Sequence, residues 1–513
     1  MFYRYVSENL TAYINEGEAE AGNKDFDYAK MNDADVEEAR EGLVEEKGFF
    51  ILPSELFCNV RAKAANDENL NETLERVFNH IEESAKGSES EGSFAGLFDD
   101  FDVNSNKLGS TVAKRNERLV KLLDGVANMN LGSVKDHDID AFGDAYEYLM
   151  TMYASNAGKS GGEFFTPADV SELLTRLGTV GKTTLNKVYD PACGSGSLLL
   201  QAVKLLGKDA VTNGFYGQEI NITTYNLCRI NMFLHDIGFD KFDIECEDTL
   251  TNPQHWDDEP FELIVSNPPY SIKWTGDDNP LLINDPRFAP AGVLAPKSKA
   301  DYAFILHGLY QLEDNGTLLA ILPHGVLFRG AAEGKIREQL IKENLIDAVI
   351  GLPDKLFLNT GIPVLILVLK KNRKNNNVLF IDASKEFITG KSKKQNDMSI
   401  ENINKVIESY KNRRFVDKFA YVSSIEKIAE NDYNLNIPRY VDTYEPPEIP
   451  DLLETLEELK DIERQIKETS IFLLKQMKQL EGTTPEAEKR HIKEVDKFEE
   501  ILIEKYGKEQ IHG

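Results

Sequence analysis

Residues 190–199 read Asp-Pro-Ala-Cys-Gly-Ser-Gly-Ser-Leu-Leu, directly after a strand-like run over 187–190 and ahead of an apolar helical segment from about Ser197. Gly194 and Gly196 permit a tight turn and a close approach of the backbone to a ligand. The N-terminus of the following helix favours a negatively charged or polar group. A nicotinamide-type fingerprint would need a third small residue where Leu199 stands, which disfavours that class of cofactor. The strand–loop–helix order therefore predicts an α/β sheet with a ligand-binding loop at residues 190–196.

Strand-like and helical segments alternate outward from this loop. The expected strands are 187–190, 214–218, 263–266, 316–322, 348–352 and 364–369, and the expected helices begin at about 197 and cover 222–235. This alternation predicts a mostly parallel, doubly wound sheet. The last two strands are close in sequence and joined by a turn that contains Gly361 and Pro363, so they are expected to form an antiparallel edge.

The two flanks of this region have helical periodicity. Near the N-terminus, Leu70, Leu74, Val77 and Ile81 recur at the spacing of one helix face. From Pro447 onward, apolar residues again recur at three- and four-residue spacings with Glu and Lys between them, which predicts a long amphipathic helix or coiled-coil arm; the alternative is a helix packed on its own domain. The expected domains are 1–150 (helical), 151–446 (α/β) and 447–513 (helical arm).

Two acidic residues follow the next expected strands. Glu219, in Tyr-Gly-Gln-Glu-Ile-Asn, falls where a carboxylate can accept both hydroxyl groups of a ribose. Asp248 follows what is expected to be the third strand and can accept a hydrogen bond from an adenine amino group. The alternative for Asp248 is a turn or helix cap.

A second motif, Asn267-Pro268-Pro269-Tyr270, follows the buried run 261–266. Two prolines stiffen the loop, so the Asn267 carboxamide and the Pro268 carbonyl are held at the carboxyl edge of the sheet. Two such acceptors suit an exocyclic amine, since they stabilise positive charge that develops on its nitrogen. Tyr270 offers a flat face for a base rotated out of a duplex. Alone, the motif could also be a rigid turn.

Together the two motifs resemble the S-adenosylmethionine-dependent amino-methyltransferases. Residues 163–167, Glu-Phe-Phe-Thr-Pro, lie upstream of the cofactor loop as in N6-adenine enzymes. Four further segments resemble the modification subunit of type I restriction-modification systems: 96–109, 352–357, 360–363 and 433–440. This resemblance implies a Rossmann-like methyltransferase domain, preceded by an α-helical domain and followed by a C-terminal helical arm.

The resemblance also implies a set of site residues. The methionine end of S-adenosyl-L-methionine is expected against Glu163, Phe164, Phe165, Thr166, Pro167 and Ala168. Gly194, Ser195 and Gly196 are expected to contact the cofactor backbone, and Glu219 its ribose. Asp248 is added as a cofactor-binding candidate from its place after the third expected strand, not from the resemblance. Asp190 is expected to orient the loop or the cofactor amine. The target adenine is expected to contact Asn267, Pro268, Pro269 and Tyr270, and no metal is expected.

The function implied is in-line transfer of the sulfonium methyl group to N6 of a flipped adenine in double-stranded DNA, which protects host DNA from restriction. The implied partners are a specificity subunit, which chooses the sequence and binds two copies of this chain, and a restriction subunit. The arm from Pro447 is the expected contact with the specificity subunit. Members of this family have further helical sequence ahead of the Phe-Tyr-Arg-Tyr segment, here residues 2–5, so the helical domain is expected to be shortened or assigned a late start.

Two alternatives remain open at this point. Enzymes that share the Asn-Pro-Pro-Tyr signature also methylate glutamine in protein or guanine in ribosomal RNA, although neither class normally needs so large a helical domain. A second alternative is a structural scaffold whose methyltransferase domain is degenerate. The intact glycine loop and Asn-Pro-Pro-Tyr motif argue against a scaffold.

The charge of the chain limits how it can meet DNA. The 513 residues carry a net charge of −29, which excludes tight duplex binding by this chain alone. Residues 1–150 contain 15 basic and 32 acidic residues, whereas residues 351–420 contain 14 basic and 7 acidic. This second segment, the basic island, is interpreted either as a phosphate-contacting strip or as solvated loop and helix faces.

The remaining sequence signals are negative. The N-terminus lacks a basic region followed by an apolar one, and the longest apolar run is far too short for a membrane span, so a cytoplasmic protein is expected. Cys58, Cys193, Cys228 and Cys246 form no C-x-x-C pair, and neither disulfides nor a zinc site are expected.

Overall fold

The computed structural model describes residues 1–130, 141–156, 166–357, 361–390, 395–444 and 451–512. The chain forms two compact units, Met1–Thr443 and Tyr444–Gly513. In the described part of the chain, no helix combines the length and the apolar character that a membrane crossing requires.

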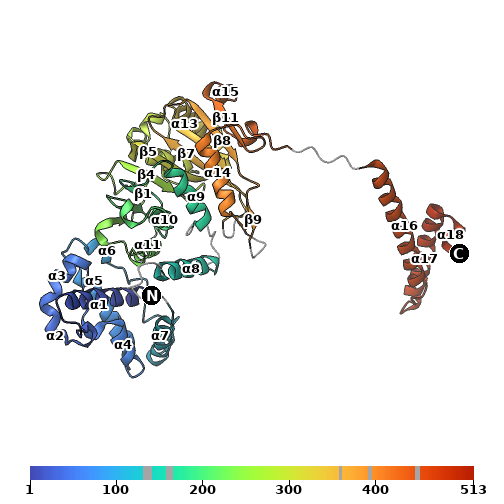
Figure 1. The fold of residues 1–513 in the computed structure, drawn as a ribbon. Coiled ribbons are helices and arrows are strands. Elements are labelled where there is room, and N and C mark those ends of the chain that lie inside the picture. Colours follow the sequence, from blue (N-terminus) through green and yellow to red (C-terminus); the bar gives the residue numbers. More distant parts are fainter. Residues whose placement is uncertain (131–140, 157–165, 358–360, 391–394, 445–450, 513) are drawn as a thin grey trace. The chain divides into compact units, whose positions relative to one another are not determined.

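Helices build the first part of unit Met1–Thr443 (Figure 1). They are α1 (Phe2–Glu20), α2 (Asp33–Val36), α3 (Arg40–Lys47), α4 (Phe57–Ala64), α5 (Leu70–Ser84), α6 (Glu91–Phe94), α7 (Val112–Ala127) and α8 (Ala141–Asn156). The predicted helix face of Leu70, Leu74, Val77 and Ile81 lies on α5 and is fully buried. The helical region expected from this periodicity is therefore present.

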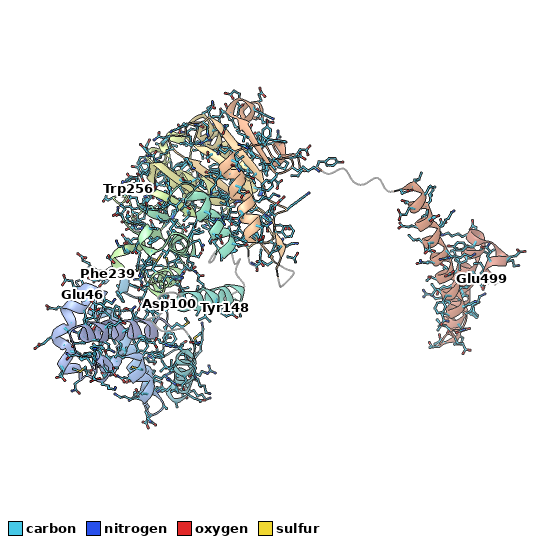
Figure 2. All side chains as sticks on the ribbon, viewed as in Figure 1. Glu46, Asp100, Tyr148, Phe239, Trp256 and Glu499 are labelled. Atoms are coloured by element: carbon cyan, nitrogen blue, oxygen red, sulfur yellow. The ribbon has the colours of Figure 1, made fainter. Side chains whose placement is uncertain are left out.

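Buried polar contacts hold this helical region against α11 (Ile222–Leu234). The Arg229 guanidinium is 1% exposed and donates to the carbonyl oxygens of Gly92 and Ala95, at 2.8 and 3.0 Å. Asn226 donates to the carboxylate of Asp100, which is labelled in Figure 2, at 3.0 Å. Because a buried charge is costly to leave unpaired, these bonds fix the helical region against α11.

A nine-stranded sheet forms the centre of the same unit. Its strands are β1 (Val188–Asp190), β2 (Phe215–Gln218), β3 (Phe242–Glu245), β4 (Phe261–Ser266), β5 (Leu312–Pro323), β6 (Ile346–Gly351), β7 (Val364–Lys370), β8 (Asn377–Asp382) and β11 (Ala420–Ser424). The strand order is β11-β8-β6-β7-β5-β4-β1-β2-β3. A separate two-stranded sheet pairs β9 (Ile388–Thr389) with β10 (Asn396–Asp397). Most neighbours in the large sheet are parallel, which confirms the predicted fold class.

The antiparallel pair is present, but its predicted position at the sheet edge is wrong. β6 and β7 pair antiparallel, and each also pairs with another strand, β8 and β5 respectively. The pair is therefore in the interior, and β11 forms the antiparallel edge against β8. The apolar run Val378–Ile381 of β8, not recognised in the sequence, extends the sheet beyond β6.

Two helical layers cover the sheet. One core joins Val188, Leu263 and Leu319 to α9 (Ala168–Gly178), α10 (Ser197–Leu206) and α14 (Ile400–Asn412); Figure 1 shows α9 and α14 close together. The opposite core joins Ile264 and Leu318 to α12 (Asp301–Gln311), α13 (Ala331–Lys342) and α15 (Ile425–Glu430). Neighbouring residues such as Leu263 and Ile264 face opposite layers, as the two-residue period of a strand requires.

The unit Tyr444–Gly513 is a helical hairpin made of α16 (Leu452–Met477), α17 (Pro485–Tyr506) and the short α18 (Lys508–His512). Leu474, Val495, Leu502 and Ile511 form its small core. Lys478 pairs with Glu499, labelled in Figure 2, at 2.6 Å. The long helix expected from the sequence thus ends at Met477, and the chain folds back on it.

Candidate functional site

Three predicted site residues lie along one edge of the sheet because their strands are parallel neighbours. β2, β1 and β4 lie in this order in the sheet, and Asp190 ends β1, Glu219 follows β2 and Asn267 follows β4. The carboxyl ends of parallel strands share one edge, which is where open α/β sheets bind ligands. We call this side the carboxyl edge.

The glycine loop has a backbone that only glycine adopts easily. Gly194 and Gly196 have φ of 55° and 81°, in the left-handed region. A Cβ atom on Gly196 would lie 2.8 Å from the Cys228 Sγ. The Gly194 N–H donates to a Glu219 carboxylate oxygen at 3.1 Å, which ties the loop to the end of β2.

The two carboxylates beside the loop are partly or fully shielded from water. Asp190 is 1% exposed and accepts a hydrogen bond from the Ala192 N–H at 3.0 Å. Burial raises the pKa of Asp190 to about 7. Burial also raises the pKa of Glu219, which accepts N–H bonds from Asn221 and Gly194.

Ser195 lies inside the loop, where its side chain is buried. Its carbonyl oxygen accepts a hydrogen bond from the Asn231 carboxamide at 2.8 Å. Asn231 is on α11, so the helix that holds the helical region also supports the loop.

Asp248 occupies the turn that was the alternative interpretation of this residue. One carboxylate oxygen accepts from the Leu250 N–H at 3.0 Å and the other from the Thr251 hydroxyl at 2.8 Å. This geometry favours a turn-capping role, with contact to an adenine amino group as an additional proposal.

The Asn-Pro-Pro-Tyr motif folds back on itself. The Tyr270 hydroxyl donates to the Asn267 Oδ1 at 2.7 Å, and the Asn267 Nδ2 donates to the Thr166 hydroxyl at 3.2 Å. The Tyr270 ring packs edge-on against Phe357, with ring centroids 6.5 Å apart. Burial raises the pKa of Tyr270 well above its usual range, so its hydroxyl remains a donor.

Thr166, from the motif upstream of the glycine loop, lies beside Asn267. Thr166 is 4% exposed, Pro167 precedes α9, and Ala168 is the first residue of that helix. Glu163, Phe164 and Phe165 lie outside the described residues. Of the predicted set, the structure therefore brings Thr166 directly to Asn267.

Three charged residues that the sequence did not single out hold the loop after Tyr270. Ser271 has φ of 50°, and its N–H donates to the Asp301 carboxylate at 2.8 Å. Arg329 donates to the same carboxylate at 2.6 Å and to Glu333 at 2.7 Å. Asp301 starts an apolar helix and is 1% exposed, so an acidic residue among apolar ones was the available signal.

One group of possible metal-binding side chains occurs among the described residues, apart from this site. It comprises Asp243, His255 and Asp258. The His255 Nε2 faces the Gly217 carbonyl at 2.9 Å, and its Nδ1 faces Asp258 at 3.2 Å. Burial opposes a charge on His255, but the bonds to Asp258 and Gly217 outweigh it and raise its pKa, as in a buried ion pair.

Comparison with known proteins identifies the family. The family model described as N-6 DNA Methylase matches residues 137–448, more than half of the chain. The chain belongs to the N-6 DNA methylase family. A second model, described as the HsdM N-terminal domain, matches residues 1–126.

The relatives of this N-6 DNA methylase show to which type of methylase within the family it belongs. It is 45% identical to a type I restriction enzyme methylase subunit of Mycoplasma pneumoniae, over 91% of this chain and 90% of the relative. It is 35% identical to such a subunit of Methanocaldococcus jannaschii, over 64% of this chain and 58% of the relative. The chain is therefore a type I methylase subunit.

Solved structures agree with this placement. The type I methyltransferase subunit of Streptococcus thermophilus matches with a TM-score of 0.76 and 40% identity, over 86% of this chain and 93% of that one. A modification subunit from Vibrio vulnificus matches with a TM-score of 0.57 at 17% identity, over 86% and 90%, and supports the fold alone. The predicted family and enzyme class are confirmed, and the glutamine, ribosomal RNA and scaffold alternatives are set aside.

Proposed function

We propose that this methylase subunit transfers a methyl group from S-adenosyl-L-methionine to N6 of adenine in DNA, at a sequence chosen by a separate specificity subunit. The observation that carries the proposal is the position of the Asn267 carboxamide. It lies at the carboxyl edge, two strands from Glu219, with the glycine loop between them.

The residues of the loop fit this cofactor. Gly194 and Gly196 hold a tight left-handed turn that lets the backbone approach a ligand, and close packing against Cys228 leaves no space for a Cβ at 196. We assign the ribose hydroxyls to Glu219 and the cofactor amine to Asp190, because a carboxylate accepts both kinds of donor. Thr166, Pro167 and Ala168 complete the proposed methionine end, together with Glu163, Phe164 and Phe165, and Ser195 backs the loop.

At the amine end, Asn267 and Pro268 provide two acceptors for the exocyclic N–H groups of adenine. Accepting both bonds stabilises the positive charge that develops on nitrogen in the transition state. Pro269 stiffens the turn, and Tyr270 stacks on the base. The cofactor supplies an electrophilic methyl group, so the protein contributes positioning and electrostatics, and the product proton leaves to water.

A transfer assay tests this assignment. The complex of this chain with its specificity subunit is incubated with tritiated S-adenosylmethionine and duplex DNA, RNA or protein. We expect label in DNA alone, and in N6-methyladenine after digestion. Label in RNA or protein without label in DNA would contradict the proposal.

Cofactor affinity is expected to increase as the pH rises through about 7, the pKa of Asp190. Below this pH the carboxyl is protonated and must lose its proton to face a cationic ligand, so affinity changes by up to about tenfold per pH unit and then levels off. Calorimetric titration at about pH 6 and pH 8 measures the change. Asp190→Asn should flatten the profile, whereas Asp209→Asn, at an exposed position, should not.

The same carboxyl has the opposite effect on the unliganded fold. Its pKa is higher in the folded chain than in the unfolded one, so its contribution to stability is present below about pH 4 and is lost as the pH rises through about 7. A parallel increase of affinity and unliganded stability with pH would exclude Asp190 as the titrating group.

We further propose that α16 contacts the specificity subunit, two copies of this chain binding each one, and that a restriction subunit joins for cleavage. Supporting this, the first part of α16 exposes a row of apolar side chains instead of burying them in its own unit. They are Leu452, Leu456, Leu459, Ile462 and Ile466, exposed by 71, 44, 50, 52 and 47%. A row of this length on a described surface is typical of a helix-docking face.

Leu456→Glu combined with Leu459→Glu is expected to release the specificity subunit. Each leucine would otherwise contribute about 1.5–3 kcal/mol on burial, and the new carboxylates would be desolvated. Gel filtration of the mixed subunits measures the loss of the complex. Glu457→Gln with Lys460→Gln, on the same exposed helix, is the matched control, and co-elution of the leucine variant would refute the contact.

A further inference from the structure

Five basic residues of the basic island line a pocket at the end of the strands away from the proposed active site. Lys370 ends β7, and Asp347 lies at the start of β6, to which β7 is antiparallel. Both therefore lie at the amino edge, where β6 and β8 begin. The pocket is a hollow of about 260 Å³, lined by Val180, Asp347, Lys370, Arg373, Lys374, Asn375, Tyr410, Lys411 and Arg413.

The floor of this pocket is already neutralised. The Asp347 carboxylate accepts hydrogen bonds from Arg373 and Arg413, both at 3.0 Å, and from the Tyr410 hydroxyl at 2.7 Å. The Arg373 side chain is 3% exposed and also donates to the Ile346 carbonyl. These groups form a structural network in which two guanidinium groups already balance the charge of Asp347.

Three lysines at the rim have no such partner. Among the described residues, the ammonium groups of Lys370, Lys374 and Lys411 make no ion pair and no hydrogen bond; Lys370 lies over the Tyr410 ring, 5.3 Å from its centroid. Burial lowers the pKa of Lys370, and Arg413 and Arg373 add to this effect, while Asp347 opposes it. The lining thus combines five cationic side chains with one carboxylate, in a chain whose net charge is −29.

The C-terminus of a helix accounts for only part of this charge. α14 ends at Asn412, so Lys411 and Arg413 interact favourably with the partial negative charge of the helix end. Lys370 ends β7 and Lys374 lies in the β7–β8 connection, so neither is on the helix. A helix dipole, equivalent to about half a charge, does not balance the group.

We propose that Lys370, Lys374 and Lys411 form a binding site for a phosphate group at the amino edge of the sheet. The site is separate from the methyl-transfer site, since the two lie at opposite ends of the strands. Its ligand is a phosphodiester of duplex DNA or a small phosphate compound, which share the chemistry that three ammonium groups lining one pocket recognise. The floor network of Asp347, Arg373 and Arg413 holds the rim in position.

Two measurements on one triple variant test the site. The triple variant combines Lys370→Gln, Lys374→Gln and Lys411→Gln. The control variant combines Lys24→Gln, Lys63→Gln and Lys107→Gln, which replace exposed lysines of the helical region. The first measurement is the rise in melting temperature of the full chain with inorganic phosphate at constant ionic strength. The second is the salt dependence of non-specific duplex binding by the complex with the specificity subunit.

Phosphate is expected to raise the melting temperature of the wild type and of the control variant, but not that of the triple variant. If the ligand is the DNA backbone, the slope of log affinity against log salt falls by about 0.9 for each DNA phosphate that a lysine no longer neutralises, so by up to about 3 in the triple variant. An abolished phosphate response with an unchanged slope assigns the site to small phosphate compounds. Equal phosphate responses and equal slopes in the variant and the control would overturn the proposal.

Discussion

Methyl transfer by an Asn267→Ala variant is expected to fall by at least about 10²–10³-fold, to below detection in a tritium assay, while cofactor affinity stays within a few-fold. The substitution removes the acceptor that stabilises charge on the amine nitrogen in the transition state. It leaves the glycine loop untouched, because the side chain of Asn267 contacts Tyr270 and Thr166 instead.

The matched control is Asn315→Ala. Asn315 is an exposed asparagine near the amino-edge part of β5, and its replacement should leave transfer at the wild-type rate. Calorimetric titration with S-adenosylmethionine shows whether the variant still binds cofactor. Transfer retained by Asn267→Ala would remove the basis of the proposed active site.

Gly196→Ala is expected to weaken cofactor binding by about ten- to a hundredfold, which corresponds to about 1.4–2.8 kcal/mol. Its φ of 81° already disfavours any side chain, and the new methyl group would lie 2.8 Å from the Cys228 Sγ and 3.3 Å from the Met232 Cε. The loop must move to relieve this contact, and the proposed cofactor contacts move with it.

Gly181→Ala separates the backbone effect from the contact. Gly181 has φ of 82°, and nothing lies within 4 Å of a Cβ built there. Both variants are therefore expected to lose about 1–2 kcal/mol of stability from the left-handed backbone, and only Gly196→Ala is expected to lose cofactor affinity. Equal affinities, measured by calorimetric titration, would contradict the role of the glycine loop.

The sequence predicted the features that depend on local pattern. The loop after β1 and the Asn-Pro-Pro-Tyr turn after β4 are strand ends with their own turn residues, and α5 has a clear apolar face. β8 and β11 were missed because their places depend on long-range pairing, of β8 with β6 and of β11 with β8. A short run such as Ala420–Ser424, half polar, gives little signal by itself.

The site was predictable to a similar degree. Residues in contiguous motifs could be named. Asp301 binds Ser271 from 30 residues away, Arg329 binds Asp301 from 28 residues away, and neither has a motif of its own. The basic residues of the basic island could be counted from the sequence, but their position at the amino edge could not be predicted, since composition does not distinguish the two edges of a sheet. Which edge a segment reaches depends on the direction of its strand, and β7 runs opposite to its neighbours.

The bond between Tyr270 and Asn267 has a consequence for which bases the proposed site accepts. A base that displaces the Tyr270 hydroxyl from the Asn267 oxygen has to bring a donor of its own. The amino group of adenine makes this an exchange of one hydrogen bond for another. A base with a carbonyl oxygen at the same position would leave the acceptor unpaired, at a cost of about 1–3 kcal/mol. The resting contact therefore discriminates between flipped bases before any methyl group is transferred.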